Sequence, residues 1–211
     1  MHLLSNRSIQ ILSPLITNWS YLPFTNFAAG PLFYAHICNE IIINDRKNIV
    51  ELGSGISTIL IARLIHINKL KINFFSIDHD SNWQLVIQKI LKADGIDTNV
   101  KFLSSPIKQY EQYSWYDHEK LNIDITIDML IVDGPPGYEL PFARFGAVPF
   151  FKNKLSTENY SIFLHDTDRN YEAQTIIEWS KILGLETLEK SLRYSVLRFG
   201  NAYTTFPQTI L

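Results

Sequence analysis

Short apolar segments alternate with longer amphipathic ones along most of the chain, and this alternation constrains the fold more than any other feature. Each short segment is rich in Ile, Leu, Val and Phe, and each longer one carries apolar residues at helical spacing. Such a pattern is typical of a parallel sheet with helices on both faces. The sequence predicts strands of this kind over residues 48–52, 74–77, 100–103, 129–132 and 160–164.

Residues that commonly start or end helices divide the chain between these strands. We expect five helices. The first covers residues 32–43 after Pro31, the second covers 57–67 with Ser57 as N-cap, and the third runs from a cap at Ser81 or Asn82 to just before Gly95. The last two cover residues 141–151 and 170–183, with Gly184 ending the latter. The segment between the third and fourth strands is rich in Tyr, Trp and His, and it is predicted to be irregular with room for one helix.

The alternation stops near the C-terminus. Residues 186–188 and 194–199 form two short strand patterns with too little chain between them for a crossover helix, so we expect them to pair antiparallel. Five parallel strands and this hairpin predict a Rossmann-like α/β fold, a three-layer sandwich around a mostly parallel seven-stranded sheet.

Length and composition predict one folded domain. A chain of 211 residues that is 46% hydrophobic can bury a sizeable core, and it contains no internal repeat or low-complexity linker. The candidate boundary lies near residue 30, so we predict an irregular N-terminal extension over residues 1–30 and the main domain over residues 31–211. The extension either packs on the sheet edge or lids a site, with Gly30 as hinge and Tyr21, Phe24 and Phe27 as aromatic surface.

Charge and hydropathy exclude several classes of partner. The net charge is −2 and Lys and Arg are scattered singly, which leaves no basic stripe for nucleic acid. No apolar run approaches the roughly 20 residues of a membrane helix, and residues 1–15 do not form a signal peptide or anchor pattern. The lone Cys38 lies in an apolar stretch and is expected to be a buried thiol. We therefore expect a cytoplasmic protein that uses neither nucleic acid nor membrane as partner.

A glycine-rich turn joins the first predicted strand to the next helix, at the sheet end where open α/β folds bind ligands. Glycines there let the backbone turn sharply and approach a ligand, and the helix start offers unpaired N–H donors that suit a carboxylate. Glu51, an acid at the strand end, suits an ammonium group either directly or through water. An amino acid headgroup carries both charges. The candidate binding residues are Glu51, Gly53, Ser54, Gly55 and Ser57.

A dinucleotide site is the alternative interpretation of this turn. It would show the pattern G-x-G-x-x-G, with a pyrophosphate at the helix N-terminus. Here Thr58 holds the third glycine position, and an acid comes shortly before the first glycine. These two departures favour an adenosylated amino acid over NAD.

Polar side chains also follow the second and third strands. Asp78 ends the second strand, where an acid can accept two hydrogen bonds from a ribose diol. His79 is expected to pack beside the ligand, and Asp80 to cap or solvate the next helix start. Ser104 and Ser105 either bind an adenine edge or form a simple turn.

Acidic residues and a histidine follow the fourth and fifth strands. Asp133 begins a rigid loop of small residues, and His165 and Asp166 lie at the end of the fifth strand. Because the ends of neighbouring parallel strands converge on one crevice, these side chains are candidates for a general base or for metal ligands. For Asp166 and Asp168, capping of the helix that begins near Asn170 is an equal alternative.

Together these motifs make the chain resemble class I S-adenosylmethionine-dependent methyltransferases, and in particular a bacterial group of small members of that superfamily. The resemblance spans most of the sequence. The glycine turn is specific for the superfamily. The Asp-Gly-Pro-Pro-Gly loop and the Asp-His-Asp strand end narrow the resemblance to this bacterial group. The matching segments are Leu22-Pro23-Phe24-Thr25, residues 50–58, Ile77-Asp78-His79-Asp80, Asp133-Gly134-Pro135-Pro136-Gly137 and Asp166-Thr167-Asp168-Arg169.

The resemblance implies a role for each motif in binding S-adenosylmethionine. The turn residues Glu51, Gly53, Gly55 and Ser57 would hold the methionine part, Asp78 the ribose hydroxyls and Ser104 or Ser105 the adenine, while Asp133 would face the transferred methyl group. Catechol-type members hold magnesium between an acid after the fourth strand and an Asp-Asn pair after the fifth. This chain offers Asp133 and Asp166-Thr167 there, so magnesium stays open as a second cofactor.

The sequence thus predicts methyl transfer from S-adenosylmethionine to a small-molecule acceptor, with a hydroxyl group as the favoured target. Asp133, His165 or Asp166 would remove the hydroxyl proton or weaken the O–H bond. There are two alternatives. An NAD-dependent oxidoreductase would share the strand-turn-helix site but would have a third glycine and no closing antiparallel hairpin, and a non-catalytic binding domain would keep the whole fold.

Overall fold

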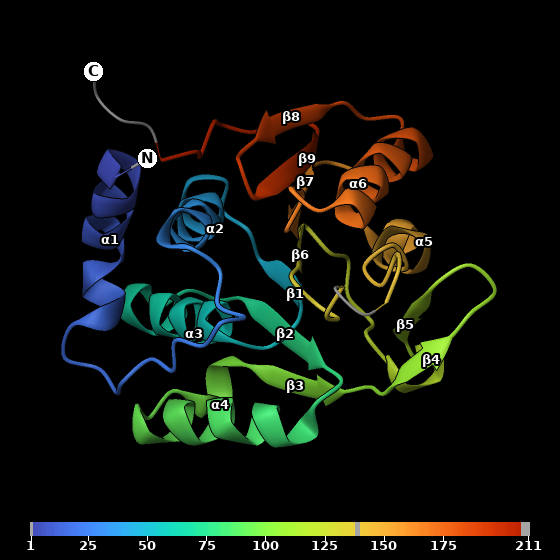
Figure 1. The fold of residues 1–211 in the computed structure, drawn as a ribbon. Helices are drawn as coiled ribbons and strands as arrows, with labels where there is room; N and C mark the ends of the chain where they lie inside the picture. The colour runs from blue at the N-terminus through green and yellow to red at the C-terminus, as the bar shows by residue number, and fades with distance from the viewer. Residues whose placement is uncertain (1, 138–139, 208–211) are drawn as a thin grey trace.

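The computed structural model describes residues 2–137 and 140–207, which form a sheet covered by helices on both faces (Figure 1). The seven strands follow the order β3-β2-β1-β6-β7-β9-β8. Their bounds are β1 Asn48–Leu52, β2 Asn73–Asp78, β3 Lys101–Ser104, β6 Met129–Val132, β7 Tyr160–His165, β8 Thr187–Lys190 and β9 Tyr194–Phe199. Neighbours from β3 to β7 pair parallel, and β9 pairs antiparallel with both β7 and β8. The predicted sheet and its closing hairpin are confirmed.

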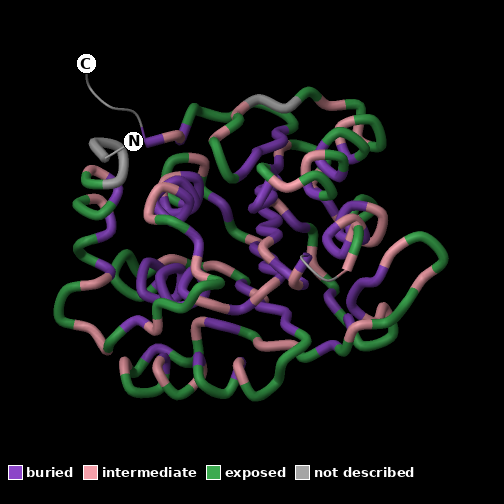
Figure 2. Tube along the Cα trace, in the orientation of Figure 1, coloured by how far each residue is buried: buried purple, intermediate pink, exposed green. Residues whose placement is uncertain are grey.

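Side chains of the central strands alternate between two cores, one on each face of the sheet. On β1, Ile49 packs in one core and Val50 in the other, and on β6 Ile131 and Leu130 divide in the same way. Parallel strands that are covered on both faces need apolar residues at every position. Figure 2 shows the resulting burial along the middle of the molecule, with exposed residues on the outer helix faces and loops.

Helices complete the outer layers of the sandwich. Helices α2 (Pro31–Ile43), α3 (Ile56–Asn68) and α4 (Ser81–Ala93) contribute to one core, and α5 (Ala147–Phe151) and α6 (Asn170–Leu183) to the other. The short helical turns η1 (Asp97–Asn99), η2 (His118–Lys120) and η3 (Lys152–Lys154) lie in connections. Among the described residues, no helix combines the length and the apolar character needed to cross a bilayer.

The N-terminal extension is not irregular throughout, because α1 covers His2–Ile16. Leu12 and Leu15 lie three residues apart, are almost fully buried and join the same core as α2 and α3. The polar residues at positions 5–8 interrupt the apolar pattern, so the helix was not recognised in the sequence. Residues 17–30 contain no helix or strand and run from α1 to α2.

Two helix starts differ from the predicted ones. Helix α3 begins directly after Gly55, so Ser57 lies inside its first turn instead of capping it. The cap of α4 is Asp80, whose Oδ1 accepts from the backbone N–H groups of Asn82 at 2.9 Å and Trp83 at 3.0 Å. The capping role predicted for Asp80 is confirmed, and the caps predicted at Ser81 or Asn82 were wrong.

The predicted helix over residues 141–151 is shorter than expected. Only α5, Ala147–Phe151, is helical, and residues 141–146 form turns. Phe142 has a φ of +55°, a left-handed conformation that a continuous α-helix does not contain. The turns bring Arg144 back toward the ends of β6 and β7, where its guanidinium contacts the loop carbonyls of Pro135 and Asp133.

A second, two-stranded sheet occupies the segment that was predicted to be irregular. Strands β4 (Ile107–Gln109) and β5 (Ser114–Tyr116) form an antiparallel hairpin beyond the end of the main sheet (Figure 1). Trp115 and Tyr116 are fully buried, and the Trp115 ring packs edge-on against Phe151. These aromatic residues therefore join the same core as α5 and α6 on this face of the main sheet.

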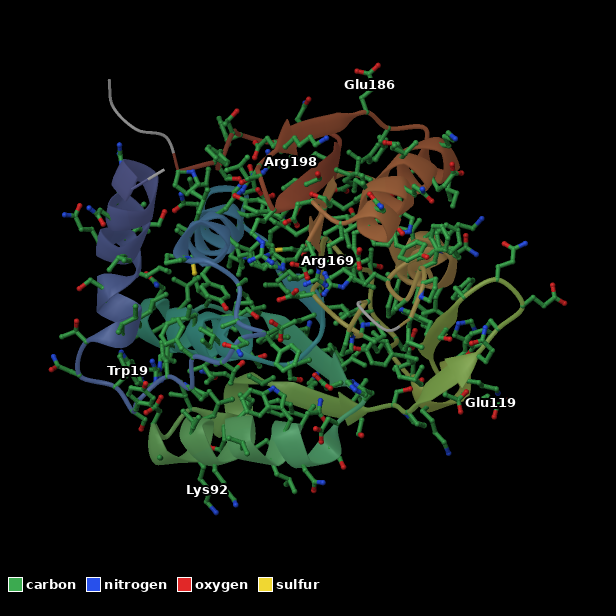
Figure 3. All side chains as sticks on the ribbon, in the orientation of Figure 1. Trp19, Lys92, Glu119, Arg169, Glu186 and Arg198 are labelled. Carbon is green, nitrogen blue, oxygen red and sulfur yellow. The ribbon has the colours of Figure 1, made fainter. Side chains whose placement is uncertain are left out.

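A buried ionic cluster fixes the C-terminal hairpin to α2. Arg198 on β9 lies between these elements (Figure 3), and its Nη2 is 2.7 Å from Oε2 of Glu40. Nη2 of Arg46 lies 2.8 Å from the other carboxylate oxygen of Glu40. All three side chains are buried. Buried charges persist when they are paired in this way, and removal of one partner is strongly destabilising.

Candidate active site

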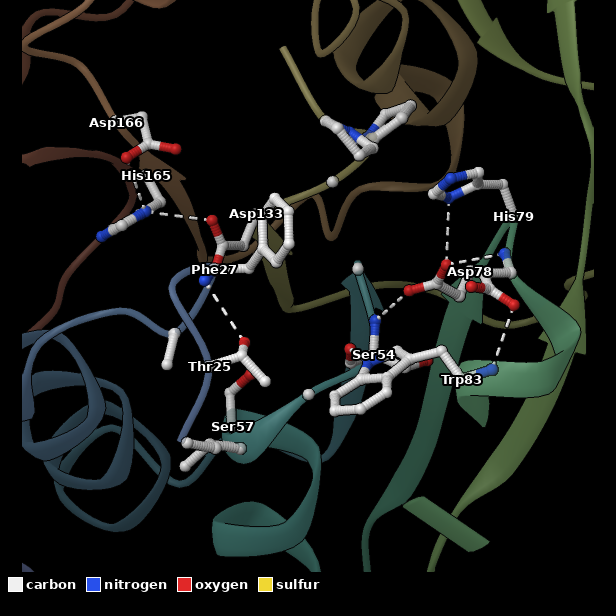
Figure 4. A pocket seen from close by; sticks show the side chains of 18 of the residues that line it. Thr25, Phe27, Ser54, Ser57, Asp78, His79, Trp83, Asp133, His165 and Asp166 are labelled. Carbon is white, nitrogen blue, oxygen red and sulfur yellow. Dashed lines mark hydrogen bonds and ion pairs between the residues drawn. The ribbon is translucent and has the colours of Figure 1, made fainter. Parts of the chain in front are cut away.

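A pocket of about 580 Å³ opens at the carboxyl ends of β1, β2, β6 and β7 (Figure 4). Pockets that hold small molecules and cofactors commonly have volumes of about 300–1,000 Å³. The pocket is lined by residues 23 and 25–28 of the extension, 53–57 after β1, 78–80 after β2, 133–136 after β6, and 165, 166 and 169 after β7, together with Tyr34, Trp83, Tyr116, Arg144 and Arg193. The location is that of ligand sites in open α/β sheets.

The turn after β1 has the shape that its glycines predict. Gly53 has a φ of +97°, and a Cβ at this position would lie 2.9 Å from the backbone N of Gly134. Only glycine allows this close approach of the β1 and β6 loops. Gly55 borders open space in the pocket and precedes α3. The first N–H groups of α3, at Ile56 and Ser57, have no intrahelical acceptor and are available to a ligand.

Asp78 is held at the end of β2 by three donors. Its Oδ2 accepts from the backbone N–H of Ser54 at 2.8 Å, and its Oδ1 accepts from that of Asp80 at 2.9 Å. Nδ1 of His79 lies 3.0 Å from the same Oδ1, and this contact raises the pKa of His79. A carboxylate has about four acceptor positions. Asp78 therefore lines the pocket in a fixed orientation, with capacity left on Oδ2.

Glu51 lies behind the glycine turn and does not line the pocket. It is fully buried, and its Oε2 accepts from the hydroxyls of Thr58 at 2.5 Å and Ser76 at 2.7 Å. Burial raises the pKa of Glu51 to about 7. The Thr58 hydroxyl also accepts from the N–H of Gly55 at 2.8 Å, so Glu51 supports the turn from behind. The direct contact with a ligand's ammonium group that the sequence suggested is not available in this position.

Ser104 and Ser105 do not line the pocket either. The Ser105 hydroxyl donates to the backbone carbonyl of Asp117 at 3.1 Å, and Ser104 is exposed at the end of β3. Tyr116 of the β4–β5 hairpin lines the pocket in their place, and its buried hydroxyl has no hydrogen-bond partner among the described residues. Trp83 also lines the pocket, with its indole N–H donating to the carbonyl of Ser54 at 2.8 Å. The sequence analysis missed both aromatic residues.

The structure brings Asp133, His165 and Asp166 together, as the convergence of strand ends predicts. Nδ1 of His165 lies 3.0 Å from Oδ1 of Asp133 and 3.2 Å from Oδ1 of Asp166. Burial lowers the pKa of His165, but the two carboxylates outweigh burial and raise it to about 9. The imidazole is therefore protonated at neutral pH and has no lone pair with which to act as a base. Of the three predicted catalytic residues, Asp133 is the one able to accept a proton.

Three arginines surround Asp166: Arg169 belongs to one of the matching segments but had no predicted role, and Arg144 and Arg193 were not predicted from the sequence. Nη2 of Arg144 and Nη1 of Arg169 both lie 3.1 Å from its Oδ2, and Nη2 of Arg193 lies 2.6 Å from its Oδ1. His165, Arg144 and Arg169 hold the pKa of Asp166 well below its usual range despite burial. The alternative role of Asp166 as a helix cap is not seen, because α6 has no side-chain cap.

These arginines also bear on the magnesium question. Within the described residues, Asp133, His165 and Asp166 offer ligand atoms that lie within 4.8 Å of one another. Magnesium prefers oxygen ligands and needs deprotonated ones, whereas His165 is protonated and both oxygens of Asp166 are already paired with guanidinium groups. A divalent cation would have to displace these positive charges. The residues present do not fit a magnesium site.

The N-terminal extension forms one wall of the pocket. Thr25 and Phe27 lie across the pocket from Asp78 and below Asp133 in Figure 4. Phe27 lines the pocket although its side chain is 71% exposed. Tyr21 and Phe24, predicted as further lid surface, are exposed and lie outside the lining.

Comparison with known proteins supports the fold. No protein-family model matches the chain, and no curated protein sequence matches it. An SAH-bound methyltransferase from Podospora anserina superposes with a TM-score of 0.64 at 14% identity, over 93% of this chain and 88% of that one. An O-methyltransferase from Streptomyces achromogenes, solved with SAM, gives 0.59 at 11% identity over 94% and 90% of the two chains.

A third solved structure gives the same result. It is an O-methyltransferase from Bacillus cereus in complex with SAH, with a TM-score of 0.57 at 12% identity, over 92% of this chain and 89% of that one. All three alignments cover most of both chains. The chain therefore has the α/β fold of these methyltransferases, as its strand order also indicates.

Proposed function

We propose that this protein transfers a methyl group from S-adenosylmethionine to an oxygen atom of a small molecule. The observation that carries the proposal is one pocket with a glycine turn and Asp78 on one side and Asp133 on the other. The shared fold adds support, because the solved neighbours include O-methyltransferases crystallised with SAM or SAH.

The cofactor would bind in the half of the pocket formed by β1 and β2. Its carboxylate would meet the N–H groups at the start of α3, where the helix dipole also favours a negative charge. Its ribose hydroxyls would donate to Asp78, and Trp83 and Tyr116 offer aromatic surface to the adenine. S-adenosylmethionine supplies a methyl group that is already activated by the positive sulfur.

The acceptor would bind in the other half, beside Asp133. Bound S-adenosylmethionine would supply the methyl group, and the electron pair of its carbon–sulfur bond would stay on sulfur. The Asp133 carboxylate would receive the proton of the acceptor's hydroxyl group. His165 and Arg144, at 3.0 Å and 3.4 Å from Oδ1 of Asp133, would hold the carboxylate in place. Because the methyl group is activated, positioning of the two reactants should supply most of the rate enhancement.

An NAD-dependent oxidoreductase is disfavoured by Thr58. In a dinucleotide site, a glycine at this position permits close helix–strand packing. Here the Thr58 side chain fills the position and links Gly55 to Glu51. A non-catalytic binding domain with this fold would bind the cofactor but transfer no methyl group to any acceptor.

Calorimetry with SAM, SAH and NAD tests the cofactor assignment. SAM and SAH should bind and NAD should not. Asp78→Ala removes acceptors for a buried ribose, which costs on the order of 1–3 kcal/mol, so both affinities should fall about tenfold to hundredfold. Asp124→Ala, at an exposed acid outside the pocket lining, is the matched control. If wild-type protein binds neither SAM nor SAH, the proposal is wrong.

A screen with labelled SAM against hydroxyl and amine acceptors tests the choice of oxygen. The support for oxygen is Asp133, because a hydroxyl acceptor needs a base at this position. Transfer to nitrogen alone would contradict it.

We also propose that residues 1–30 act as a lid, because residues 23 and 25–28 line the pocket. We further propose that the protein works in the cytoplasm, where a reducing environment suits the free, buried Cys38.

A further inference from the structure

The ends of β6 and β7 carry more positive charge than the proposed reaction uses. Arg144, Arg169 and Arg193 line the pocket there together with His165, which is protonated at neutral pH. The carboxylates in contact with them are those of Asp133, Asp166 and Asp168. Three guanidinium groups therefore meet three carboxylates, and Arg169 and Arg193 lie on the acceptor side of the pocket without a role in the proposed reaction.

Asp166 arranges these cations and has little capacity for a ligand. Each of its oxygens has two cationic neighbours: Arg144 and Arg169 at Oδ2, and Arg193 and His165 at Oδ1. This uses the roughly four acceptor positions of a carboxylate. Asp166 also has a φ of +59°, an uncommon conformation for a residue with a side chain. Strained backbone of this kind is often retained where a site must be held in a defined geometry.

Arg169 and Arg193 keep donors available for a ligand. Their side chains are 38% and 52% exposed, and each contacts Asp166 through one nitrogen. The other contact of Arg193, from Nε to Asp168, is long at 3.7 Å. A guanidinium has five N–H donors in a fork that fits a carboxylate or a phosphate. Helix α6 begins directly after Arg169, so its positive N-terminal end lies at the same place.

The cofactor's own carboxylate is an unsuitable partner for this fork. The glycine turn follows β1, whereas Arg169 follows β7 and Arg193 precedes β9, the other neighbour of β7; β6 lies between β1 and β7 in the sheet. Two strand spacings of about 4.8 Å each separate the two positions by roughly 10 Å. Asp133, in contrast, follows β6 and contacts the same Arg144 that contacts Asp166.

We infer that the methyl acceptor carries an anionic group, a carboxylate or a phosphate, which Arg169 and Arg193 bind next to Asp133. This inference rests on the proposed function and narrows its substrate class to hydroxy acids and phosphorylated hydroxy compounds. The arginines hold the anion, and Asp133 receives the proton of the hydroxyl group. The same cations leave no place for a divalent metal.

Titration of matched acceptor pairs tests the inference. Calorimetry with and without saturating SAH would compare 4-hydroxybenzoate with phenol, and glycerol 3-phosphate with glycerol. At least one anionic member should bind, and its uncharged partner should bind at least tenfold more weakly. Arg169→Gln and Arg193→Gln should each weaken anion binding about tenfold to hundredfold, as expected for loss of a charge-assisted hydrogen bond. Arg193→Lys should retain part of the affinity, because it keeps the charge but loses the fork.

Controls separate the inference from the proposed function. Lys181→Gln removes the same charge from an exposed position on α6 and should change no affinity. SAH affinity in the two Arg→Gln variants should stay within about twofold of wild type, while thermal unfolding reports whether they fold. Failure of wild-type protein to bind SAH contradicts the proposed function. If wild-type protein binds SAH but neither anion, or binds phenol or glycerol as tightly as the corresponding anion, the inference is wrong. It is also wrong if the two Arg→Gln variants lose as much affinity for SAH as for the anion.

Discussion

The two halves of the pocket are held together by different interactions. At the ends of β1 and β2, backbone groups and hydroxyls make the contacts: Ser54 donates to Asp78 through its N–H, and Thr58 donates to Glu51. At the ends of β6 and β7, ionised side chains make them, and partners 22 and 27 residues away from Asp166 converge on it. The first half is fixed by backbone geometry and the second by charge.

This difference matches what each half would have to do. A turn that presents backbone N–H groups suits one constant ligand, because its donors cannot be changed by substitution of a side chain. Arginines and acids at loop ends can be exchanged singly, which suits a region that selects among acceptors. We therefore expect variants in the β1–β2 half to change cofactor affinity, and variants in the β6–β7 half to change turnover and acceptor choice.

Asp133→Asn should show the largest effect of these variants. If it does not, the expected difference between the β1–β2 half and the β6–β7 half of the pocket is wrong. The substitution keeps the size of the side chain but removes its charge and basicity. With an acceptor identified by the screen, the rate should fall by about 10²–10⁴, as is typical for loss of general acid–base catalysis, while SAH affinity stays nearly unchanged. Single-turnover kinetics and calorimetry on the same preparation measure the two quantities.

Chelation is the control for this prediction. Activity should be insensitive to a chelator, because guanidinium groups occupy the oxygens of Asp166 that a metal would need. Loss of activity on chelation, restored by magnesium, would assign Asp133 to a metal site. Full activity of Asp133→Asn would show that the residue is structural and would leave only the cofactor half of the site.

The sequence predicted what depends on local pattern. The strand over residues 48–52, the glycine turn and the closing hairpin all follow from neighbouring residues, and each was placed correctly. Glu51 also follows the strand pattern, yet its orientation is decided by the hydroxyls of Thr58 and Ser76, of which Ser76 lies on the neighbouring strand. Sequence distance gives no sign of that contact.

The parts that were missed depend on tertiary contacts. Helix α1 is stabilised by burial of Leu12 and Leu15 against other helices, and the β4–β5 hairpin by an aromatic core, so neither has a clear periodicity of its own. Arg144 and Arg193 come to the pocket from a turn and from the hairpin end, away from any strand end that the sequence marked. The sequence around a single arginine does not show whether the residue lies on a solvated surface or in an ion-pair network.

Gly53→Ala and Gly55→Ala form a matched pair that sharpens the account of the cofactor half. A Cβ at Gly53 meets backbone of residue 134 at 2.9 Å in a left-handed conformation, so this variant should lose about 2–4 kcal/mol of unfolding free energy. Gly55 has an extended φ of −174° and borders open space. Its variant should keep wild-type stability but lose SAH affinity, because the added methyl group enters the pocket. Equal stability of the two variants would contradict the role of the Gly53–Gly134 approach.

The pH dependence of stability should show the smallest effect, and it tests whether His165 is a cation or a base. The pKa of His165 rises from 6.5 in the unfolded chain to about 9 in the folded protein, so its ion pairs contribute stability that is fully present below pH 6.5 and is lost as pH rises through 9. Denaturant unfolding of wild type and His165→Asn should therefore differ by about 1–3 kcal/mol more at pH 6.5 than at pH 10. His66→Asn, at an exposed position outside the pocket lining, is the control substitution. A pH-independent difference for His165→Asn would mean that the imidazole is neutral in the folded protein, and His165 would then return beside Asp133 as a candidate base.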